Sequence, residues 1–222
     1  NPFGRRIISI ISINWLRVMG QVSYYVWLTK QFTAPINVAI PSGNFGNAYS
    51  AWFGREHGLP INEILCSTNV NDVLRRFIDG GVLEPLVTQP SVAPSMDIQI
   101  PSSLERLIFD VSSEAKSFYD QLQTNSKAQL DEKSVDGLKN VFSSVSFSDE
   151  MITNLITSLH HEFAIIFDPH SVTSVQMALD NDCSIPSSII KKSIIRIAPA
   201  MCLTFIVHIL TDVLSFLQNT TQ

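Results

Sequence analysis

A short apolar segment that runs into a loop with two glycines restricts the fold of this chain more than any other feature. Residues 37 to 40, which read Asn-Val-Ala-Ile and end at Pro41, favour a short buried strand. Gly43 and Gly46 then let the chain turn sharply, because neither has a Cβ atom. Residues 47 to 57 are predicted to continue as a helix. The segment therefore predicts a strand, a tight loop and a helix in direct succession.

The glycine loop has two possible roles. At the start of a helix it can offer main-chain N–H groups and the positive end of the helix dipole to an anion. It can equally be an ordinary strand-to-helix turn whose glycines ease tight packing, and the spacing alone leaves both roles open. The loop lacks the third glycine of the dinucleotide fingerprint and the Lys-Ser/Thr pair of a nucleoside-triphosphate loop, so neither of those sites is indicated.

The first half of the chain alternates between helices and strands. A largely buried helix is predicted over residues 13 to 32, where apolar residues recur at helical spacing. A strand is predicted over 64 to 67, and Asn69 is predicted to cap a helix that ends at the glycines at 80 and 81. This alternation indicates an α/β fold with a parallel sheet covered by helices.

After Asp97 the predicted elements are mostly helical. The first is a helix that begins at a capping box of Ser102 and Glu105 and ends near 118. A polar surface segment follows from 124 to 139. The last three are a helix capped by Ser148, a strand over 163 to 167, and a helix from 171 to about 179.

Composition limits the class of protein. The chain has 222 residues, is 45% hydrophobic and carries a formal net charge of -5, which suits one well-buried globular unit and gives no basic excess for nucleic acid. Cys66, Cys183 and Cys202 are too widely spaced to imply a disulfide framework or a zinc site, so an intracellular setting is expected. The stretch from 197 to 211 has no charged residue, yet it is shorter than the roughly 20 residues of a membrane helix.

The glycine loop and its neighbours resemble one enzyme family. Residues 41 to 47, Pro-Ser-Gly-Asn-Phe-Gly-Asn, look like the cofactor-phosphate loop of threonine synthase and the threonine synthase-like proteins, which are pyridoxal phosphate enzymes of fold type II. Six further blocks occur in the family's order: 12 to 17 with Gln21 and Tyr24-Tyr25, 58 to 61, 68 to 74, 94 to 98, 102 to 106, and 168 to 170. The chain is therefore identified as a member of this family, matching its C-terminal portion.

The resemblance implies a domain arrangement. Residues 1 to 182 correspond to part of the large cofactor-binding domain, with a parallel-sheet core followed by a helix-rich part. Residues 183 to 222 depart from the family and are expected to form a divergent apolar tail. Because the chain does not begin with Met, it is expected to start inside a longer protein.

The resemblance also implies a binding site for the 5′-phosphate of pyridoxal phosphate. By this resemblance, six residues are expected to hold the phosphate, chiefly through main-chain N–H groups: Ser42, Gly43, Asn44, Phe45, Gly46 and Asn47. The Phe45 ring offers a phosphate nothing and is predicted to pack in the core.

Two further residues correspond to the family's site for the phosphate of the substrate, O-phosphohomoserine. These are Ser12 and Arg17. The planar guanidinium suits two phosphate oxygens at once, and Ser adds a short hydroxyl donor. The alternative for Arg17 is a solvated helix residue whose stem packs on the surface. Ile11 stands where the family has Asn, and Ile cannot form a side-chain hydrogen bond.

Other titratable residues admit structural and catalytic interpretations. His170 can titrate near neutral pH, but in Asp-Pro-His either Asp168 or His170 more simply caps the following helix. Asp97 can line the cleft or cap a turn. His160 and His161 are adjacent, so on a helix they would not share a metal ion, and no metal site is predicted.

The family's Schiff-base lysine, in a Ser-Phe-Lys type motif, is absent from these 222 residues, so no catalytic residue is assigned and this chain alone is not expected to turn over substrate. Two functions remain. One is a fragment of a cytoplasmic pyridoxal phosphate lyase that converts O-phosphohomoserine to threonine or a keto acid. The other is a non-catalytic domain that binds a phosphate ligand or a partner. Neither nucleic acid nor membrane is expected as a partner, and the oligomeric state stays open.

Overall fold

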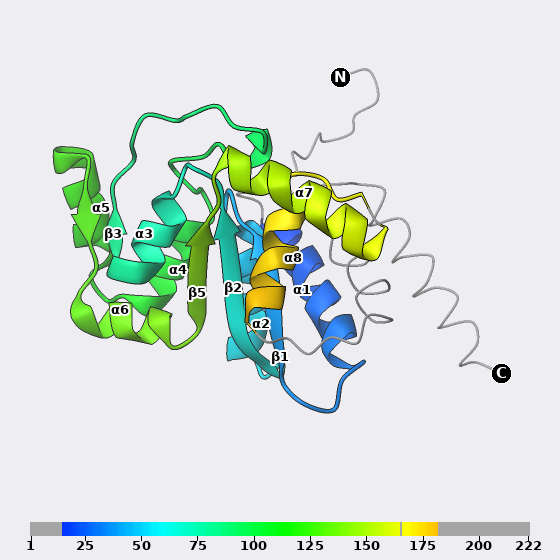
Figure 1. Cartoon of the computed structure of the whole chain (residues 1–222). Helices are drawn as coiled ribbons and strands as arrows, with labels where there is room; N and C mark the ends of the chain where they lie inside the picture. Colours follow the sequence, from blue (N-terminus) through cyan, green and yellow to red (C-terminus); the bar gives the residue numbers. More distant parts are fainter. Residues whose placement is uncertain (1–14, 165, 182–222) are drawn as a thin grey trace, which may run out of the picture. The chain divides into compact units, whose positions relative to one another are not determined.

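The computed structural model describes residues 15–164 and 166–181, without the side chain of Phe163. Figure 1 shows helices packed around a small central sheet. The elements are α1 (Trp15–Thr29), β1 (Ile36–Pro41), α2 (Gly46–Glu56), β2 (Ile61–Thr68), α3 (Val73–Gly80), β3 (Val82–Leu83), the 3₁₀ helix η1 (Pro94–Met96), α4 (Leu104–Val111), α5 (Ala115–Asn125), β4 (Ala128–Gln129), α6 (Glu132–Lys139), β5 (Phe142–Ser146), α7 (Asp149–Phe163) and α8 (Ser171–Asp180).

The central sheet is parallel, in the order β1-β2-β5. Its middle strand, β2, is buried from Leu65 to Thr68, as expected for a parallel strand with both faces covered. In Figure 1, α8 lies in front of β1 and β2 while α2 lies behind them, and both helices contact these strands. The predicted parallel, helix-covered sheet is confirmed. A separate antiparallel pair joins β3 to β4.

Helix α1 confirms the predicted helix but not its predicted burial. Val18, Gln21 and Tyr25 are buried at four-residue or shorter spacing, so one face of the helix packs on the rest of the protein. On the other side Trp15 is 45% exposed and Leu16 is 64% exposed. Apolar residues at helical spacing identify a helix, but they do not reveal how many of its apolar side chains are covered by the rest of the protein.

The third strand lies where the sequence signal is weak. Residues 163 to 167 were expected to form a strand, but α7 continues to Phe163, and Ala164 ends it in the left-handed conformation. The strand is instead β5, which reads Phe-Ser-Ser-Val-Ser. Its serines are accommodated by tertiary hydrogen bonds, since Ser144 Oγ donates to the Cys66 carbonyl at 2.8 Å. A serine-rich strand of this kind has too few apolar residues to stand out in the sequence.

This strand gives a stability prediction. Ser144→Ala should lower the free energy of unfolding by about 1 kcal/mol, because it removes the hydrogen bond to Cys66. Ser143 is its matched control, since its Oγ is buried without a hydrogen-bond partner in the described part of the chain. Ser143→Ala should therefore be neutral or slightly stabilising. Urea unfolding curves of both variants would measure the difference, and equal losses would contradict it.

Three local predictions in the middle of the chain are wrong. Asn69 does not cap α3, whose N-cap is Asp72. The helix expected through 118 breaks at Ser112, whose hydroxyl accepts a hydrogen bond from the Glu114 N–H and replaces a helical one. The predicted capping box is also wrong, because the N-cap residue of α4 is Ser103 and not Ser102.

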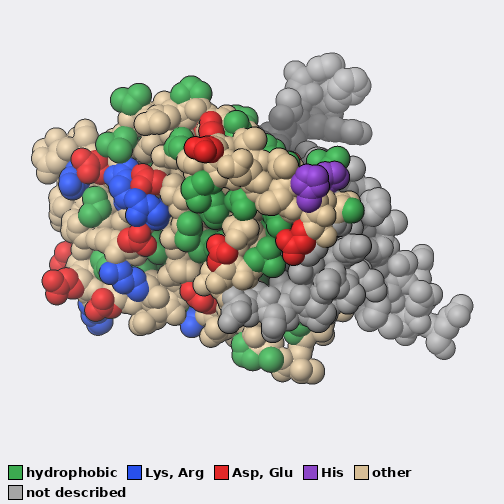
Figure 2. All heavy atoms as spheres, viewed as in Figure 1, with side chains coloured by type: hydrophobic (Ala, Val, Ile, Leu, Met, Phe, Trp, Pro, Cys, Tyr) green, Lys and Arg blue, Asp and Glu red, His purple; other side chains and the backbone are tan. Residues whose placement is uncertain are grey.

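The segment from 124 to 139 is more than a surface loop. It contains β4 and α6, and Val135 and Leu138 of α6 are buried. Figure 2 shows acidic and basic side chains intermixed over the region that α3, α5 and α6 form in Figure 1, so no single sign of charge dominates there. The predicted cap Ser148 is confirmed, because its side chain accepts from the Met151 N–H.

Several predictions fall on residues outside the described ranges. They concern Ser12, Cys183, Cys202 and the tail from 183 to 222. Among the residues that are described, no helix is both long and apolar enough to cross a membrane.

Candidate functional site

The glycine loop connects β1 to α2 at the carboxyl end of the parallel sheet. The Ser42 N–H donates to the Ser67 carbonyl at 2.8 Å, which ties the start of the loop to β2. The Asn44 carbonyl accepts from the Ser103 N–H at 3.1 Å, which ties the middle of the loop to the start of α4. The loop is therefore held by two neighbours at the edge of the sheet where α/β proteins place their ligands.

The main-chain N–H groups of this loop indicate the type of site that binds an anion. Within residues 15–164 and 166–181, no group accepts a hydrogen bond from the N–H of any residue from 43 to 47. Residues 46 and 47 also begin α2, whose first N–H groups have no helical acceptor and carry the positive end of the dipole. Consecutive N–H donors at a helix start, called the cradle below, are the kind of group with which proteins bind phosphate.

Phe45 fixes the shape of this cradle. It adopts φ 64° and ψ 6°, a left-handed conformation that is rare for a residue with a Cβ atom. Its ring is only 2% exposed and packs against the Phe142 ring, with 5.5 Å between the ring centroids. The predicted packing role of the Phe45 ring is confirmed. The buried ring holds the backbone in a conformation that the chain would not otherwise favour.

The two glycines differ in what surrounds them. A Cβ atom on Gly43 would lie 2.7 Å from the Ser95 carbonyl oxygen of η1, so the backbone of that helix fills the place of a side chain. A Cβ on Gly46 would come no closer than 3.4 Å to Ser103 Oγ. Tight packing therefore explains Gly43, whereas Gly46 has room for a methyl group.

The polar side chains of the loop are directed at the protein. Ser42 Oγ donates to the Ile40 carbonyl at 3.3 Å. Asn44 Oδ1 lies 3.5 Å from both the N–H and the hydroxyl of Ser102. Asn47 Oδ1 accepts a hydrogen bond from the Tyr25 hydroxyl, which is buried. These contacts leave main-chain groups, rather than side chains, for a ligand.

Helix α1, which carries Arg17, packs along α2. Gln21 Oε1 accepts from Ser50 Oγ at 3.2 Å, and Tyr25 reaches Asn47, so this face of α1 lies on the first turn of α2. Arg17 stands four residues before Gln21 and is half-buried, which places it one turn along the same face. Burial raises the pKa of Tyr24, and the nearby charge of Arg17 acts in the opposite direction.

Asp168 and His170 occupy the start of α8. Asp168 Oδ1 accepts from the Ser171 N–H at 3.2 Å, so the aspartate caps this helix, as the structural interpretation of Asp-Pro-His predicts. The hydrogen bond from His170, together with bonds from the Ser171 hydroxyl and the N–H groups of both residues, holds the pKa of Asp168 well below its usual value. His170 Nε2 also accepts from the Ser95 N–H at 3.1 Å, a contact that the sequence did not reveal.

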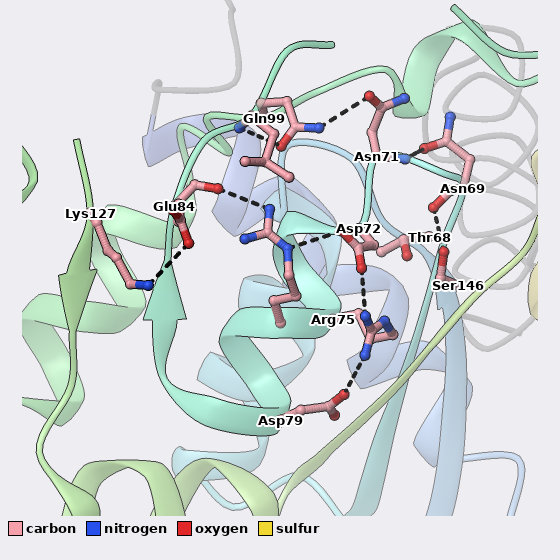
Figure 3. Close-up of polar contacts among 12 residues, drawn as sticks. Thr68, Asn69, Asn71, Asp72, Arg75, Asp79, Glu84, Gln99, Lys127 and Ser146 are labelled. Atoms are coloured by element: carbon pink, nitrogen blue, oxygen red, sulfur yellow. Dashed lines mark hydrogen bonds and ion pairs between the residues drawn. The ribbon is translucent and has the colours of Figure 1, made fainter. Parts of the chain in front are cut away.

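Asp97 anchors the loop that carries η1. Its Oδ1 accepts from Ser91 Oγ at 2.6 Å and from Asn69 Nδ2 at 2.7 Å, and its Oδ2 accepts from the Ser91 N–H at 3.1 Å. Figure 3 shows the neighbouring amides, in which Gln99 Nε2 donates to Asn71 Oδ1 and the Asn71 N–H donates to Asn69 Oδ1. Asp97 therefore has a structural role, because it fixes the loop around η1 to Asn69 and Ser91.

Cys66 has a structural role in the core of the protein. Burial raises the pKa of the Cys66 thiol to about 12, and the side chain lies in the core of β2 as predicted. In the described part of the chain, no three His, Cys, Asp or Glu residues lie together in a group that could hold a metal ion.

Sequence comparison relates the chain to threonine synthases. No family model matches the sequence. It is 31% identical to threonine synthase from Pseudomonas aeruginosa over 182 residues, which cover 79% of this chain and 39% of that protein. It is 31% identical to threonine synthase from Saccharomyces cerevisiae over 80% of this chain and 40% of that protein. It is 30% identical to Homo sapiens threonine synthase-like 1 over 79% of this chain and 26% of that protein.

Structure comparison agrees. The structure of yeast threonine synthase matches with a TM-score of 0.74 and 30% identity, over 83% of this chain and 42% of that one. The crystal structure of PLP-bound threonine synthase from Brucella melitensis matches with a TM-score of 0.73 and 30% identity, over 77% of this chain and 38% of that one. The chain thus spans about two fifths of the length of these threonine synthases. Over about 80% of its length the chain is homologous to threonine synthases and threonine synthase-like proteins, and it has part of the α/β fold of these fold type II pyridoxal phosphate enzymes.

Proposed function

We propose that this chain provides the cofactor-phosphate site and the substrate-phosphate site of a lyase that converts O-phosphohomoserine to threonine, or to a keto acid, with release of phosphate. The observation that carries the proposal is the run of N–H donors from residues 43 to 47 at the start of α2. The two threonine synthase structures and the relatives above support the choice of pyridoxal phosphate as the anion.

The residues present fit the phosphate end of pyridoxal phosphate. The N–H groups of residues 43 to 47 would hold the phosphate oxygens, with Phe45 anchoring the backbone between them, Ser42 fixing the start of the loop and Asn44 its middle. The dipole of α2 supports the negative charge without a lysine or arginine in the loop. When bound, the cofactor supplies an electron sink for proton removal from the substrate. In this proposal residues 1 to 182 form part of the cofactor-binding domain, and residues 183 to 222 form a divergent tail.

Arg17 is proposed to bind the phosphate of O-phosphohomoserine, with Ser12 as a second donor. Arg17 lies one helical turn from Gln21, whose Oε1 accepts from Ser50 Oγ of α2, and its long side chain would bring a permanent positive charge toward the substrate. A guanidinium binds a phosphate through two parallel hydrogen bonds, and it would hold this leaving group in a fixed orientation.

This role predicts a selective defect. Arg17→Ala should weaken binding of O-phosphohomoserine to the full chain by about tenfold to a hundredfold, because it removes charge-assisted hydrogen bonds. It should leave binding of pyridoxine 5′-phosphate unchanged, since the N–H groups of the loop hold that phosphate. Calorimetric titration would measure both affinities, and Lys30→Ala, which removes an exposed charge just after α1, is the matched control.

The result would also separate the two functions. A domain that only retains a phosphate ligand at the loop, as the absence of a Ser-Phe-Lys motif allows, would bind pyridoxine 5′-phosphate yet show no Arg17-dependent binding of O-phosphohomoserine. Equal affinity of pyridoxine and pyridoxine 5′-phosphate for the wild-type chain would refute the phosphate site altogether.

A further inference from the structure

We infer that His170 is a positioning residue of the cofactor-phosphate loop, because it holds η1 in place behind Gly43. The inference rests on the proposed function for its connection to the cofactor. It goes beyond that function in assigning a role to a histidine that immediately precedes α8 and is remote from the loop in sequence.

The two hydrogen bonds of the His170 ring determine which nitrogen carries the proton. The Ser95 N–H lies 3.1 Å from His170 Nε2, and a backbone N–H can only donate. Nε2 must therefore be the nitrogen without a proton. Nδ1 then carries the proton and donates to Asp168 Oδ1 at 3.1 Å. The two contacts together require the neutral Nδ1–H form of the imidazole.

The backbone of Ser95 packs against the loop at Gly43. The Ser95 carbonyl oxygen stands 2.7 Å from the place of a Cβ on Gly43, and Met96 Cα stands 3.4 Å from the same place. The backbone of η1 is therefore the wall against which Gly43 packs. If η1 moved away, Gly43 would lose the backbone that packs against it, and the first N–H groups of the loop would be less well positioned.

Two separate sets of contacts hold η1. On one side Asp97 binds Asn69 Nδ2 and Ser91 Oγ, which secures the chain around η1 to the end of β2. On the other side His170 connects Ser95 to the start of α8. Asp168 is itself fixed by N–H groups of His170 and Ser171 at 2.9 and 3.2 Å. The imidazole thus links the start of α8 to the backbone of η1 that packs against Gly43.

Three variants of the full chain test the inference. His170→Ala should weaken binding of pyridoxine 5′-phosphate and accelerate hydrogen exchange of the Ser95 N–H, each by about tenfold, the effect of one lost hydrogen bond. His170→Gln should restore both, since its amide oxygen can accept from Ser95 while its amide nitrogen donates to Asp168. His161→Ala, an exposed histidine on α7, should change neither.

Nitrogen-15 NMR of the imidazole adds a readout that a loss of stability would not mimic. The wild-type chain at neutral pH should show His170 with its proton on Nδ1. A proton on Nε2, or wild-type exchange of Ser95 and wild-type binding in His170→Ala, would overturn the inference. If the wild-type chain does not bind pyridoxine 5′-phosphate at all, the proposed function fails, while the tautomer and the exchange of Ser95 still decide whether His170 positions η1.

Discussion

Phe45→Ala is expected to lower the free energy of unfolding by about 3 to 5 kcal/mol, the usual loss for a fully buried aromatic ring. The ring is 2% exposed and packs on Phe142 of β5, so its removal leaves a cavity between the loop and the sheet. The same variant should lose binding of pyridoxine 5′-phosphate, because the left-handed backbone at residue 45 would no longer be anchored. Urea unfolding and calorimetric titration would measure the two effects.

The backbone conformation of Phe45 supplies a second comparison. At most positions Gly is less favourable than Ala, but at a left-handed position Gly avoids a steric cost of about 1 to 2 kcal/mol. Phe45→Gly should therefore be no less stable than Phe45→Ala, although it removes one more carbon. Phe32→Ala, at a side chain 41% exposed, should cost about 0.5 kcal/mol. Equal losses at Phe32 and Phe45 would show that the loop is not anchored by its ring.

Gly43→Ala is expected to have the second largest effect. The added methyl group would meet the Ser95 carbonyl at 2.7 Å, and a backbone atom of η1 cannot rotate away as a side chain can. Overpacking of this kind costs about 1 to 3 kcal/mol, and displacement of either segment should also weaken phosphate binding. Thermal unfolding and titration with pyridoxine 5′-phosphate would record both.

Gly46→Ala is the matched control for Gly43→Ala. Its methyl group would meet only Ser103 Oγ at 3.4 Å and Gln21 Oε1 at 3.8 Å, which are ordinary contacts with side-chain atoms. Stability should stay within about 0.5 kcal/mol of the wild type. If both alanine variants were equally stable, η1 would not be the wall behind Gly43.

Local patterns predicted the first strand, loop and helix of the sheet, although they misplaced the caps and bounds of α3 and α4. The strand, loop and helix from 36 to 57 were predicted because each is encoded by neighbouring residues, and the structure confirms them as β1, the loop and α2. The C-cap at Gly81 follows the same rule, since a left-handed residue at φ 71° favours glycine. By contrast β5 was missed because its serines depend on partners in β2 and beyond, which are far away in the sequence.

In the candidate site, too, local features could be predicted from the sequence, whereas contacts between distant segments could not. The loop residues were found because their order resembles a family motif, and the structure confirms the packing role of Phe45. The contact of Gly43 with Ser95 and that of Ser95 with His170 were not predictable, because they join segments 52 and 75 residues apart. The spacing of Arg17, Gln21 and Tyr25 was a usable signal, since residues four apart share one face of a helix.

The most direct test of the account is residue-resolved NMR of the full chain during titration with pyridoxine 5′-phosphate, which has no aldehyde to react with lysines. The account predicts that the amide resonances of residues 43 to 47 shift together and saturate, and that pyridoxine without the phosphate leaves them unchanged. A titration in which those amides stay unperturbed, or in which pyridoxine shifts them equally, would contradict the claim that these main-chain N–H groups hold the cofactor phosphate.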